Sequence, residues 1–210
     1  MTYTVESYSK LHDETLKPIA SRLHALLVRH FSGLPHVDQI TVRAKSPESF
    51  AEKAMKLVDG KPKYDRPLSQ LYDLIGARLV VFYLADVTPA VAQATQLAAT
   101  VERLKRQPEQ LTAFGYEGVH LCLAMPPDAI PRQISRGDAP KLFELQIKTL
   151  FQHAWSQAEH DLRYKGPPRL EDEEERMVAA AAAQAWGADR MFDEIFKRHG
   201  VPGTPNPQEF

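Results

Sequence analysis

The spacing of apolar residues along the chain predicts helices at both ends of the sequence. Leucine and isoleucine recur at helical intervals through residues 5–31, and this pattern ends near Gly33 and Pro35. Ser46 and Pro47 supply an N-cap and a first-turn proline, so a second helix is expected from there through about Val58. The stretch DGKPKYDRP that follows is expected to be a loop.

Strands and helices are expected to alternate through the rest of the chain. Apolar or alternating runs predict strands at residues 38–43, 77–83, 118–125 and 141–148. Helical spacing predicts a short helix from residue 67 and longer helices at residues 86–107, 149–165 and 171–199. The last two are expected to be separated at Gly166, Pro167 and Pro168, and the tail at 200–210 is expected to be disordered.

The strand near residue 145 has an apolar face and a polar face. Successive side chains of a strand point to opposite sides, so a period of two separates six consecutive residues into two sets. The apolar set is Phe143, Leu145 and Ile147, and the polar set is Glu144, Gln146 and Lys148. Glu144 therefore points away from the core that the apolar set predicts.

Composition indicates an ordinary globular protein. With 210 residues, 43% of them hydrophobic, the chain is long enough for one sizeable domain. No apolar run approaches the roughly 18 residues that a membrane span needs, and the start of the sequence lacks the features of a signal peptide. The single cysteine, Cys122, excludes an internal disulfide and a cysteine-based zinc site, and is expected to be buried. We expect a cytoplasmic protein with no membrane partner.

The net charge of −1 argues against general nucleic-acid affinity, but basic residues gather locally. Residues 41–66 contain seven basic and four acidic side chains. Arg43 and Lys45 share a strand face, and Ser49 and Lys53 lie one turn apart near a helix N-terminus, which favours anions. These four residues predict a cradle for a polyphosphate. The alternative is a solvated helix with ordinary lysines.

Two further groups of residues suggest a ligand site. Arg78 is the one charged residue within the apolar run IGARLVVFY, so it needs water, an anion, an aromatic face, or an ion pair with Asp73. Tyr116 and His120 flank Gly118 on one face of a strand, a layout that suits a stacked base. The alternative for this pair is a core tyrosine beside a hydrogen-bonded histidine. His153 and His160 are spaced too widely for typical helical metal ligands and are expected to be structural.

Five motifs in order resemble the synthetase domain of the RelA/SpoT-homology alarmone synthetases. They are RAKSPESFAEK, DLIGARLV, GYEGVH, FELQIKT and QHAWSQAEHDLRYK, and the resemblance covers about residues 38–166. It implies an α+β fold in which a mixed sheet of about four or five strands is flanked by helices, as in nucleotidyltransferases. It also implies one small synthetase domain over residues 1–199, with helical flanks at residues 5–32 and 169–199.

The resemblance assigns a reaction and a set of residues. Members of that family transfer the β,γ-pyrophosphate of ATP to the ribose 3′-hydroxyl of GDP or GTP, which gives ppGpp or pppGpp. The resemblance implies that Asp73 and Glu144 bind Mg²⁺ and that Glu144 activates the attacking hydroxyl. The ATP-binding residues that it implies are Arg43, Lys45, Ser49, Lys53 and Arg78, and the acceptor-binding residues are Tyr116, His120, Gln146 and Lys148.

Two departures from the family pattern leave the acceptor open. Gly118 stands where the family usually has serine, and Lys148 stands where arginine is common. One alternative is therefore a toxic synthetase that modifies tRNA 3′ ends or adenosine nucleotides and is neutralised by an antitoxin protein. Another is a non-catalytic nucleotide- or RNA-binding module, against which the pair Asp73 and Glu144 argues. A homo-oligomer is compatible with the sequence.

Overall fold

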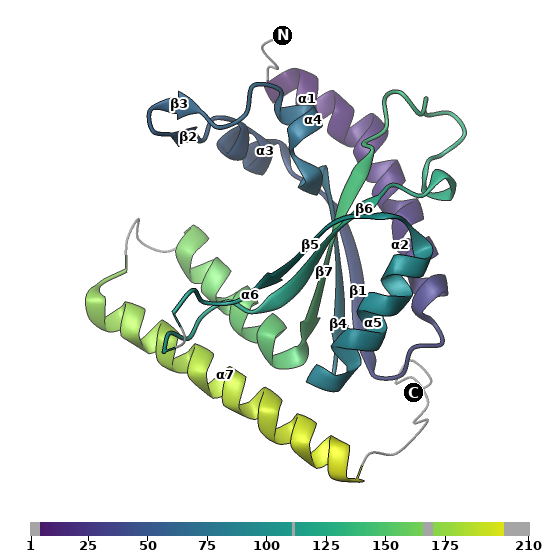
Figure 1. Ribbon diagram of the computed structural model, residues 1–210. Coiled ribbons are helices and arrows are strands. Elements are labelled where there is room, and N and C mark those ends of the chain that lie inside the picture. The colour runs from purple at the N-terminus through teal and green to yellow at the C-terminus, as the bar shows by residue number, and fades with distance from the viewer. Residues whose placement is uncertain (1–4, 111, 166–169, 200–210) are drawn as a thin grey trace.

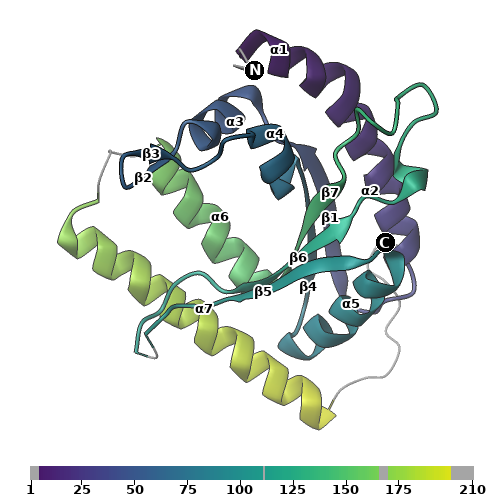
Figure 2. The ribbon, with the colours of Figure 1, turned by 45° about the horizontal axis from the view of Figure 1, so that its top comes forward.

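The computed structural model describes residues 5–110, 112–165 and 170–199. Within these ranges, five strands form one mixed sheet with helices on both of its faces (Figures 1 and 2). This confirms the expected α+β architecture and strand number. The predictions for the break at residues 166–168 and for the tail at 200–210 concern segments outside the described residues. None of the described helices combines the length and hydrophobicity needed to cross a bilayer.

The elements have the following bounds. The helices are α1 (Val5–Leu11), α2 (Lys17–Phe31), α3 (Pro47–Ala54), α4 (Pro67–Gln70), α5 (Leu84–Leu97), α6 (Leu150–Lys165) and α7 (Asp172–His199). A π-helical turn, η1 (His12–Leu16), joins α1 to α2, and two 3₁₀ turns are η2 (Tyr72–Leu74) and η3 (Pro127–Ala129). The strands are β1 (Val37–Ala44), β2 (Leu57–Val58), β3 (Lys61–Pro62), β4 (Ile75–Val81), β5 (Thr100–Arg106), β6 (Gly118–Ala124) and β7 (Leu142–Thr149).

The main sheet has the strand order β1-β4-β7-β6-β5. Its central pair, β4 and β7, is parallel, and the other neighbouring strands are antiparallel. One face of the sheet carries Leu79, Leu121 and Leu145, all fully buried. α2 and α5 lie on one side of the sheet, and α3 and α6 lie on the other (Figure 1). The predicted division of residues 143–148 into an apolar and a polar face extends to the neighbouring strands, where Arg78 of β4 and His120 of β6 lie on the polar side opposite Gln146.

The predicted helix over residues 86–107 is wrong in its second half. α5 ends at Leu97, and Thr100–Arg106 forms β5, an antiparallel edge strand beside β6. Most side chains of β5 are exposed, so its sequence carries almost no core signal, and its charged residues suit an edge strand. Backbone hydrogen bonds to β6 decide the conformation of this segment, and these are invisible to a periodicity argument.

The helix that begins at Pro47 is shorter than predicted, and the following segment is not wholly a loop. α3 ends at Ala54, and β2 and β3 form a small antiparallel hairpin. Asp59 and Gly60 make its turn with positive φ angles of 51° and 75°. An Asp-Gly pair is a strong signal for a two-residue hairpin turn, and the charged residues around it obscured that signal. The predicted cap is confirmed, because the Ser49 N–H donates to Ser46 Oγ at 3.2 Å.

Buried leucines of α2 are expected to dominate the stability of the domain. Leu23 is 0% exposed, whereas Val28 on the same helix is 38% exposed. Leu23→Ala should lower the free energy of unfolding by about 2–5 kcal/mol, because it removes buried methyl groups and leaves a cavity. Val28→Ala should change it by less than about 0.5 kcal/mol. Urea unfolding of both variants measures the difference, and equal effects would contradict this packing.

Candidate active site

Strand register brings polar residues from three strands into rows across one face of the sheet. Gly76 of β4 lies opposite Glu144 of β7, and Arg78 lies opposite Gln146. On the other side of β7, Gln146 lies opposite His120 of β6. Because paired residues in neighbouring strands point to the same face, these side chains share one surface. Gly76 leaves open space at its position in the row.

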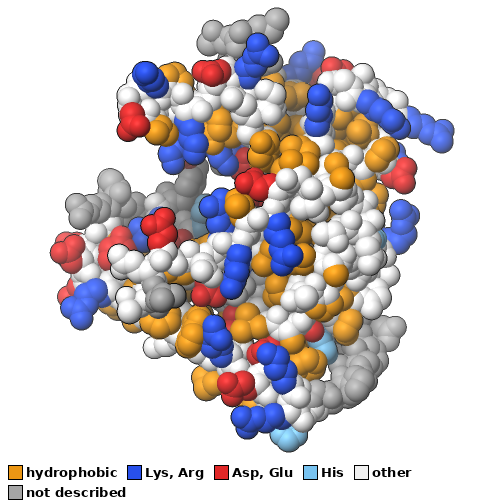
Figure 3. Space-filling view, viewed as in Figure 1, with side chains coloured by type: hydrophobic (Ala, Val, Ile, Leu, Met, Phe, Trp, Pro, Cys, Tyr) orange, Lys and Arg blue, Asp and Glu red, His pale blue; other side chains and the backbone are white. Residues whose placement is uncertain are grey.

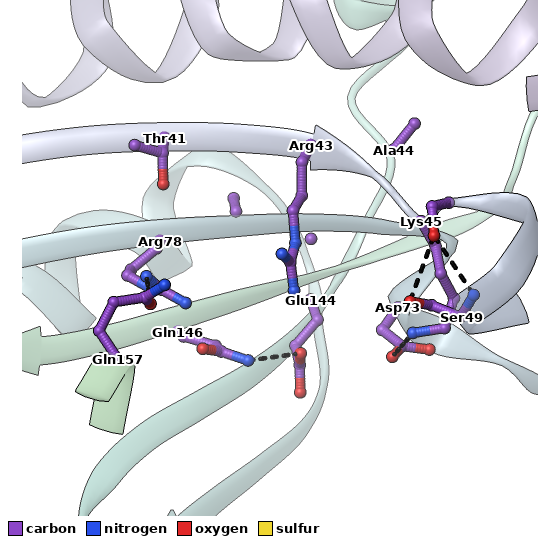
Figure 4. A pocket seen from close by; sticks show the side chains of 13 residues that line it. Thr41, Arg43, Ala44, Lys45, Ser49, Asp73, Arg78, Glu144, Gln146 and Gln157 are labelled. Atoms are coloured by element: carbon purple, nitrogen blue, oxygen red, sulfur yellow. Dashed lines mark hydrogen bonds and ion pairs between the residues drawn. The ribbon is translucent and has the colours of Figure 1, made fainter. Parts of the chain in front are cut away.

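Two pockets lie on this polar face. The first, the β1-side pocket, has a volume of about 330 Å³. Figure 4 shows Arg43 extending from β1 toward Glu144, with Arg78 beside Gln157 at one end and Lys45 beside Asp73 at the other. The lining residues are Thr41, Arg43, Ala44, Lys45, Ser46, Ser49, Asp73, Gly76, Ala77, Arg78, Glu144, Gln146 and Gln157. The side chains are mainly cationic or hydrogen-bonding, which suits a phosphate-bearing ligand.

The second, the β5-side pocket, has a volume of about 280 Å³. Its lining residues are Lys53, Tyr64, Gln70, Leu71, Tyr72, Asp73, Glu102, Leu104, Arg106, His120, Leu121, Cys122 and Glu144. Asp73 and Glu144 line both pockets. The two carboxylates therefore stand at the boundary between two compartments, each of which has its own set of side chains.

Asp73 is held by two lysines. Its Oδ2 accepts hydrogen bonds from Lys45 Nζ at 2.8 Å and from Lys53 Nζ at 2.7 Å. Burial raises the pKa of the Asp73 carboxyl, but the hydrogen bonds and charges of the two lysines outweigh burial and leave this pKa below its usual value. Asp73 is thus a carboxylate at neutral pH. Its second oxygen, Oδ1, is buried without a hydrogen-bond partner.

Glu144 is held by a chain of hydrogen bonds on the other side. Its Oε1 lies 2.7 Å from His120 Nδ1, its Oε2 accepts from Gln146 Nε2 at 3.0 Å, and His120 Nε2 lies 2.7 Å from the Tyr116 hydroxyl. A carboxylate only accepts, so His120 donates from Nδ1, and in the neutral ring Nε2 accepts from Tyr116. Burial has the largest single effect and raises the pKa of Glu144, but the hydrogen bond and charge of His120 and the hydrogen bond from Gln146 together outweigh it and leave this pKa below normal.

Arg78 does not pair with Asp73, which was one of the alternatives from the sequence. Its Nη1 donates to Gln157 Oε1 at 2.9 Å and lies 3.2 Å from His153 Nδ1, and both partners belong to α6. Burial and the positive charge of Arg78 lower the pKa of His153, which keeps its ring neutral and able to accept. The hydrogen-bonding role expected for His153 is confirmed. Arg78 Nε is buried without a partner.

Lys148 is almost fully buried behind Tyr116. It is 2% exposed, its Nζ donates to Ser156 Oγ at 2.8 Å, and the same nitrogen lies 4.3 Å from the centroid of the Tyr116 ring. A Cβ at Gly118 would lie 3.3 Å from the Tyr116 hydroxyl and 3.4 Å from Lys148 Cγ. The glycine therefore gives the lysine and tyrosine room to pack closely. Burial, together with the charge of Arg78, lowers the pKa of Lys148 to about 7.

The structure groups the candidate residues in a different way from the sequence. The candidates in the β1-side pocket are Arg43, Lys45, Ser49, Asp73, Arg78, Glu144 and Gln146, and those in the β5-side pocket are Lys53, His120, Asp73 and Glu144. Tyr116 and Lys148 line neither of these pockets. Tyr116 contacts His120 of the β5-side pocket, whereas Lys148 contacts Ser156, which lines neither pocket.

Several residues of the two pockets were missed by the sequence argument. Gln157 lies four residues after His153 on α6, a spacing that signals one helical face. Glu102 and Arg106 lie four residues apart on β5, so they share one face of this strand, and both line the β5-side pocket. The segment was predicted to be helical. A correct strand assignment would have identified both.

The donor set fits a magnesium ion. Mg²⁺ in phosphate-transfer sites is bound by one or two carboxylates together with substrate phosphates and water. Asp73 Oδ1 is buried without a partner and Glu144 lines the same two pockets, so these carboxylates can supply the protein ligands. Among the described residues, no cluster of three or more His, Cys, Asp or Glu side chains is arranged to hold a metal.

A family model described as a region found in RelA / SpoT proteins matches residues 42–168, more than half of the chain. The chain belongs to this RelA/SpoT family. The match contains the end of β1, the site strands β4 and β7, and helix α6. Among curated proteins, none matches this sequence.

Solved structures resemble this RelA/SpoT protein over most of its length. Small alarmone synthetase 1 of Bacillus subtilis matches with a TM-score of 0.71 and 22% identity, covering 87% of this chain and 94% of that chain. Its structure bound to its product pppGpp matches with a TM-score of 0.68 and 20% identity, covering 93% and 98%. A GTP pyrophosphokinase family protein from Streptococcus pneumoniae matches with a TM-score of 0.69 and 22% identity, covering 93% of this chain and 95% of that chain. At these identities the likeness establishes the shared fold.

The buried Lys148 is expected to make stability depend on pH. Its pKa is lowered from 10.5 to about 7, so between these values the unfolded chain binds more protons than the folded protein. Compared with Lys148→Met, the wild type should gain about 1–3 kcal/mol of stability between about pH 6.5 and about pH 9. Urea unfolding of both proteins at the two pH values measures this gain, and a constant difference would show that the lysine titrates normally.

Proposed function

We propose that this protein transfers the β,γ-pyrophosphate of ATP to the ribose 3′-hydroxyl of GDP or GTP. The observation that carries the proposal is the position of Asp73 and Glu144, which line both of two adjacent pockets. A group transfer between two nucleotides needs two binding compartments that meet at the reacting atoms. Membership of the RelA/SpoT family and the fold shared with a synthetase solved with pppGpp support the same reaction.

The β1-side pocket is assigned to ATP. Arg43 and Lys45 come from the end of β1, and Ser49 lies in the first turn of α3, near backbone N–H groups that favour phosphate. Arg78 lies at the far end of the same pocket, where its planar guanidinium is placed for the adenine. Lys53 faces the β5-side pocket and is assigned to the transferred phosphates at the boundary.

Glu144 is assigned as the general base. The acceptor 3′-hydroxyl gives its proton to Glu144, its oxygen bonds to the β-phosphorus of ATP, and the bond to the α-phosphate oxygen breaks so that AMP leaves. His120 and Gln146 hold the carboxylate at hydrogen-bonding distances of 2.7 and 3.0 Å, which fixes its orientation. Its lowered pKa keeps it deprotonated at neutral pH, ready to accept the proton.

Asp73 and Glu144 are assigned to hold magnesium. Magnesium bound there supplies neutralisation of the charge on the transferred phosphates. Lys45 and Lys53 balance the Asp73 carboxylate, with Nζ to Oδ2 distances of 2.8 and 2.7 Å. When ATP binds, the two ammonium groups can replace some of their hydrogen bonds to Asp73 with hydrogen bonds to phosphate oxygens.

A second candidate acceptor is an RNA 3′ end or an adenosine nucleotide. The basic side chains that line the β5-side pocket are Lys53, which is paired with Asp73, and Arg106. Lys148, the residue expected to meet the acceptor phosphates, is bound to Ser156 and buried. A pocket with few free cations favours an acceptor whose reacting nucleotide carries a single 5′-phosphate, as at an RNA 3′ end or in AMP. An antitoxin protein as partner belongs to this second candidate.

A panel of acceptors decides between the two. Purified protein is incubated with γ-labelled ATP, Mg²⁺ and, separately, GDP, GTP, AMP, ATP or deacylated tRNA. Labelled ppGpp or pppGpp supports the first candidate, and label transferred only to tRNA or to an adenosine nucleotide supports the second. No transfer to any of the five acceptors by folded protein would contradict the proposed reaction.

Glu144→Gln keeps the shape of the side chain but removes the base and a magnesium ligand. We expect the transfer rate to fall by about 10²–10⁴-fold or more, with an unchanged circular dichroism spectrum. The matched control is Glu102→Gln, which neutralises another acid of the β5-side pocket that has no assigned role and should keep most of the activity. Near-normal turnover in a folded Glu144→Gln protein would remove Glu144 from the mechanism.

Tyr116 is assigned to stack on the acceptor base with the ring face opposite Lys148. Tyr116→Ala should lose roughly 1–3 kcal/mol of stacking, seen mainly as a higher acceptor KM, with little change in ATP affinity. Tyr116→Phe keeps the ring and should keep the acceptor KM, although it loses the 2.7 Å contact with His120. Separate titrations with an ATP analogue and with GDP measure the affinity of each pocket. If Tyr116→Ala lowered only the affinity for the ATP analogue, the assignment of the two pockets would be reversed.

A further inference from the structure

The segment that carries Tyr116 lies against α7. In both ribbon views the chain between β5 and β6 passes beside this helix (Figures 1 and 2). Phe114 meets Trp186 of α7 edge to face, with 5.7 Å between the ring centroids and 71° between the ring planes. Gly115 and Glu117 line a small cavity whose other walls come from α6 and α7. We call residues 114–117 the Tyr116 segment.

Trp186 is also held by a contact within its own helix. The guanidinium of Arg190, one turn further along α7, lies 4.2 Å from the centroid of the Trp186 ring. A cation over an indole face is attracted to the ring, and this contact favours one orientation of the side chain. Trp186 and Phe114 are 38% and 41% exposed, so they meet at the rim of the fold. A contact at the rim can open and close while the core stays packed.

Asp189, on the same side of α7, anchors this helix to the end of β7. Its Oδ2 accepts a hydrogen bond from the Thr149 hydroxyl at 2.6 Å, and both side chains are buried. Asp189 also lines the small cavity, and its Oδ1 is buried without a hydrogen-bond partner among the described residues. Burial, followed by the negative charges of Glu117 and Asp193, raises the pKa of Asp189 to about 6, against the hydrogen bond from Thr149 and the charge of Arg190.

The charge of Asp189 acts directly on the Tyr116 segment. Glu117 belongs to that segment, so its carboxylate is repelled by an ionised Asp189 and not by a protonated one. The segment is therefore held more firmly as the pH falls through about 6 and less firmly above that pH. On the face visible in Figure 3, basic and acidic side chains are mixed, so we attribute the contact to these local groups and not to two oppositely charged surfaces.

Tyr116 itself contacts the active site and does not line this cavity. Its hydroxyl lies 2.7 Å from His120 Nε2, and its ring centroid lies 4.3 Å from Lys148 Nζ. The residues on both sides of Tyr116 in the sequence therefore face α7, while Tyr116 faces the site. A displacement of α7, or a loss of its contacts, is transmitted to the tyrosine ring.

We propose that Trp186 and Asp189 are positioning residues for the acceptor nucleotide. They hold the neighbours of Tyr116 against α7, and thereby place the Tyr116 ring for the acceptor base without touching that base. The inference rests on the proposed function, because it concerns the acceptor that Tyr116 is assigned to bind. A binding residue that is held in place before binding lowers the ordering cost of binding, so these two residues act on acceptor affinity and not on the transfer step.

Steady-state kinetics with the acceptor that the wild type uses separate positioning from chemistry. Trp186→Ala should raise the acceptor KM by about two- to tenfold, the range expected for loss of one aromatic pair, and should leave kcat and the KM for ATP within about twofold. Trp186→Phe keeps an aromatic ring and should recover most of the affinity. The matched control is Phe192→Ala, which removes a 52% exposed aromatic of α7 that stacks on Phe151 of α6, and which should leave the acceptor KM unchanged.

A double variant tests whether Trp186 acts through Tyr116. In a Tyr116→Ala background, Trp186→Ala should raise the acceptor KM no further, because the ring that α7 positions is already gone. If the two changes were additive, or if Trp186→Ala lowered kcat and left the acceptor KM unchanged, the inference would be overturned.

The role of Asp189 is tested by a pH profile. Asp189→Asn removes the repulsion of Glu117 at every pH, so the acceptor KM of the wild type, divided by that of the variant, should be near one at pH 5 and about threefold or more at pH 8. Lys148, whose pKa is about 7, titrates in both proteins and cancels in this ratio. A ratio that is the same at both pH values would remove Asp189 from the proposal.

Tryptophan fluorescence gives a readout that does not depend on turnover. Trp155→Phe leaves Trp186 as the one tryptophan of the chain. In that protein, Phe114→Ala should shift the Trp186 emission, because it removes the ring that meets the indole. Emission unchanged by Phe114→Ala would overturn the inference whatever the transfer assay gives. An emission shift in a folded protein that transfers to no acceptor would instead contradict the proposed function and leave the contact between α7 and the Tyr116 segment established.

Discussion

The parallel pairing of β4 with β7 is the constraint on which the site depends. Its register sets Gly76 beside Glu144 and Arg78 beside Gln146, and it sets Leu79 beside Ile147 in the core on the opposite face. A shift of the pairing by one residue would turn Glu144 into the core and an isoleucine or leucine into the pockets. The burial of the apolar face therefore fixes the position of the polar one, and the hydrophobic core and the site are specified together.

The polar face carries charges that compensate one another at short range. Asp73 faces two lysines, Glu144 faces His120, and Arg78 faces two neutral acceptors of α6. Removing an ionised carboxylate from water without partners costs several kcal/mol, so these contacts keep the groups charged inside the fold. The groups are also held in place before any ligand binds. Such preorganisation is what transfer of a highly charged phosphoryl group requires.

Local periodicity predicted the elements that bury a clear apolar face. The alternation of residues 143–148, the helical spacing of residues 5–31 and the cap at Ser46 all have a direct structural counterpart. β5 was not predictable in the same way, because its side chains are largely exposed and its conformation comes from pairing with β6. The hairpin turn at Asp59 and Gly60 had a recognisable signal that was lost among charged residues.

The residues of the candidate site also divide into those that a local sequence pattern indicates and those that only tertiary contacts reveal. Asp73, Arg78 and Glu144 could be singled out because these charged residues precede or interrupt apolar strands. The burial of Lys148 against Tyr116 depends on Gly118 in the neighbouring strand and on Ser156 in α6, so no local pattern reveals it. Gln157 and His153 acquire a role only when α6 packs over Arg78. Contacts between distant segments decide these features, and one sequence read along its length does not contain them explicitly.

Joint binding of a divalent ion by Asp73 and Glu144, at the boundary of the two pockets, is the proposed basis of the reaction. Manganese, a paramagnetic substitute for magnesium, can be titrated by electron paramagnetic resonance in the presence of a non-hydrolysable ATP analogue. The wild type should bind Mn²⁺ more tightly than free analogue does, and Asp73→Asn and Glu144→Gln should each weaken this binding by about tenfold or more. Equal Mn²⁺ affinity in all three folded proteins would show that these two carboxylates do not form a metal site.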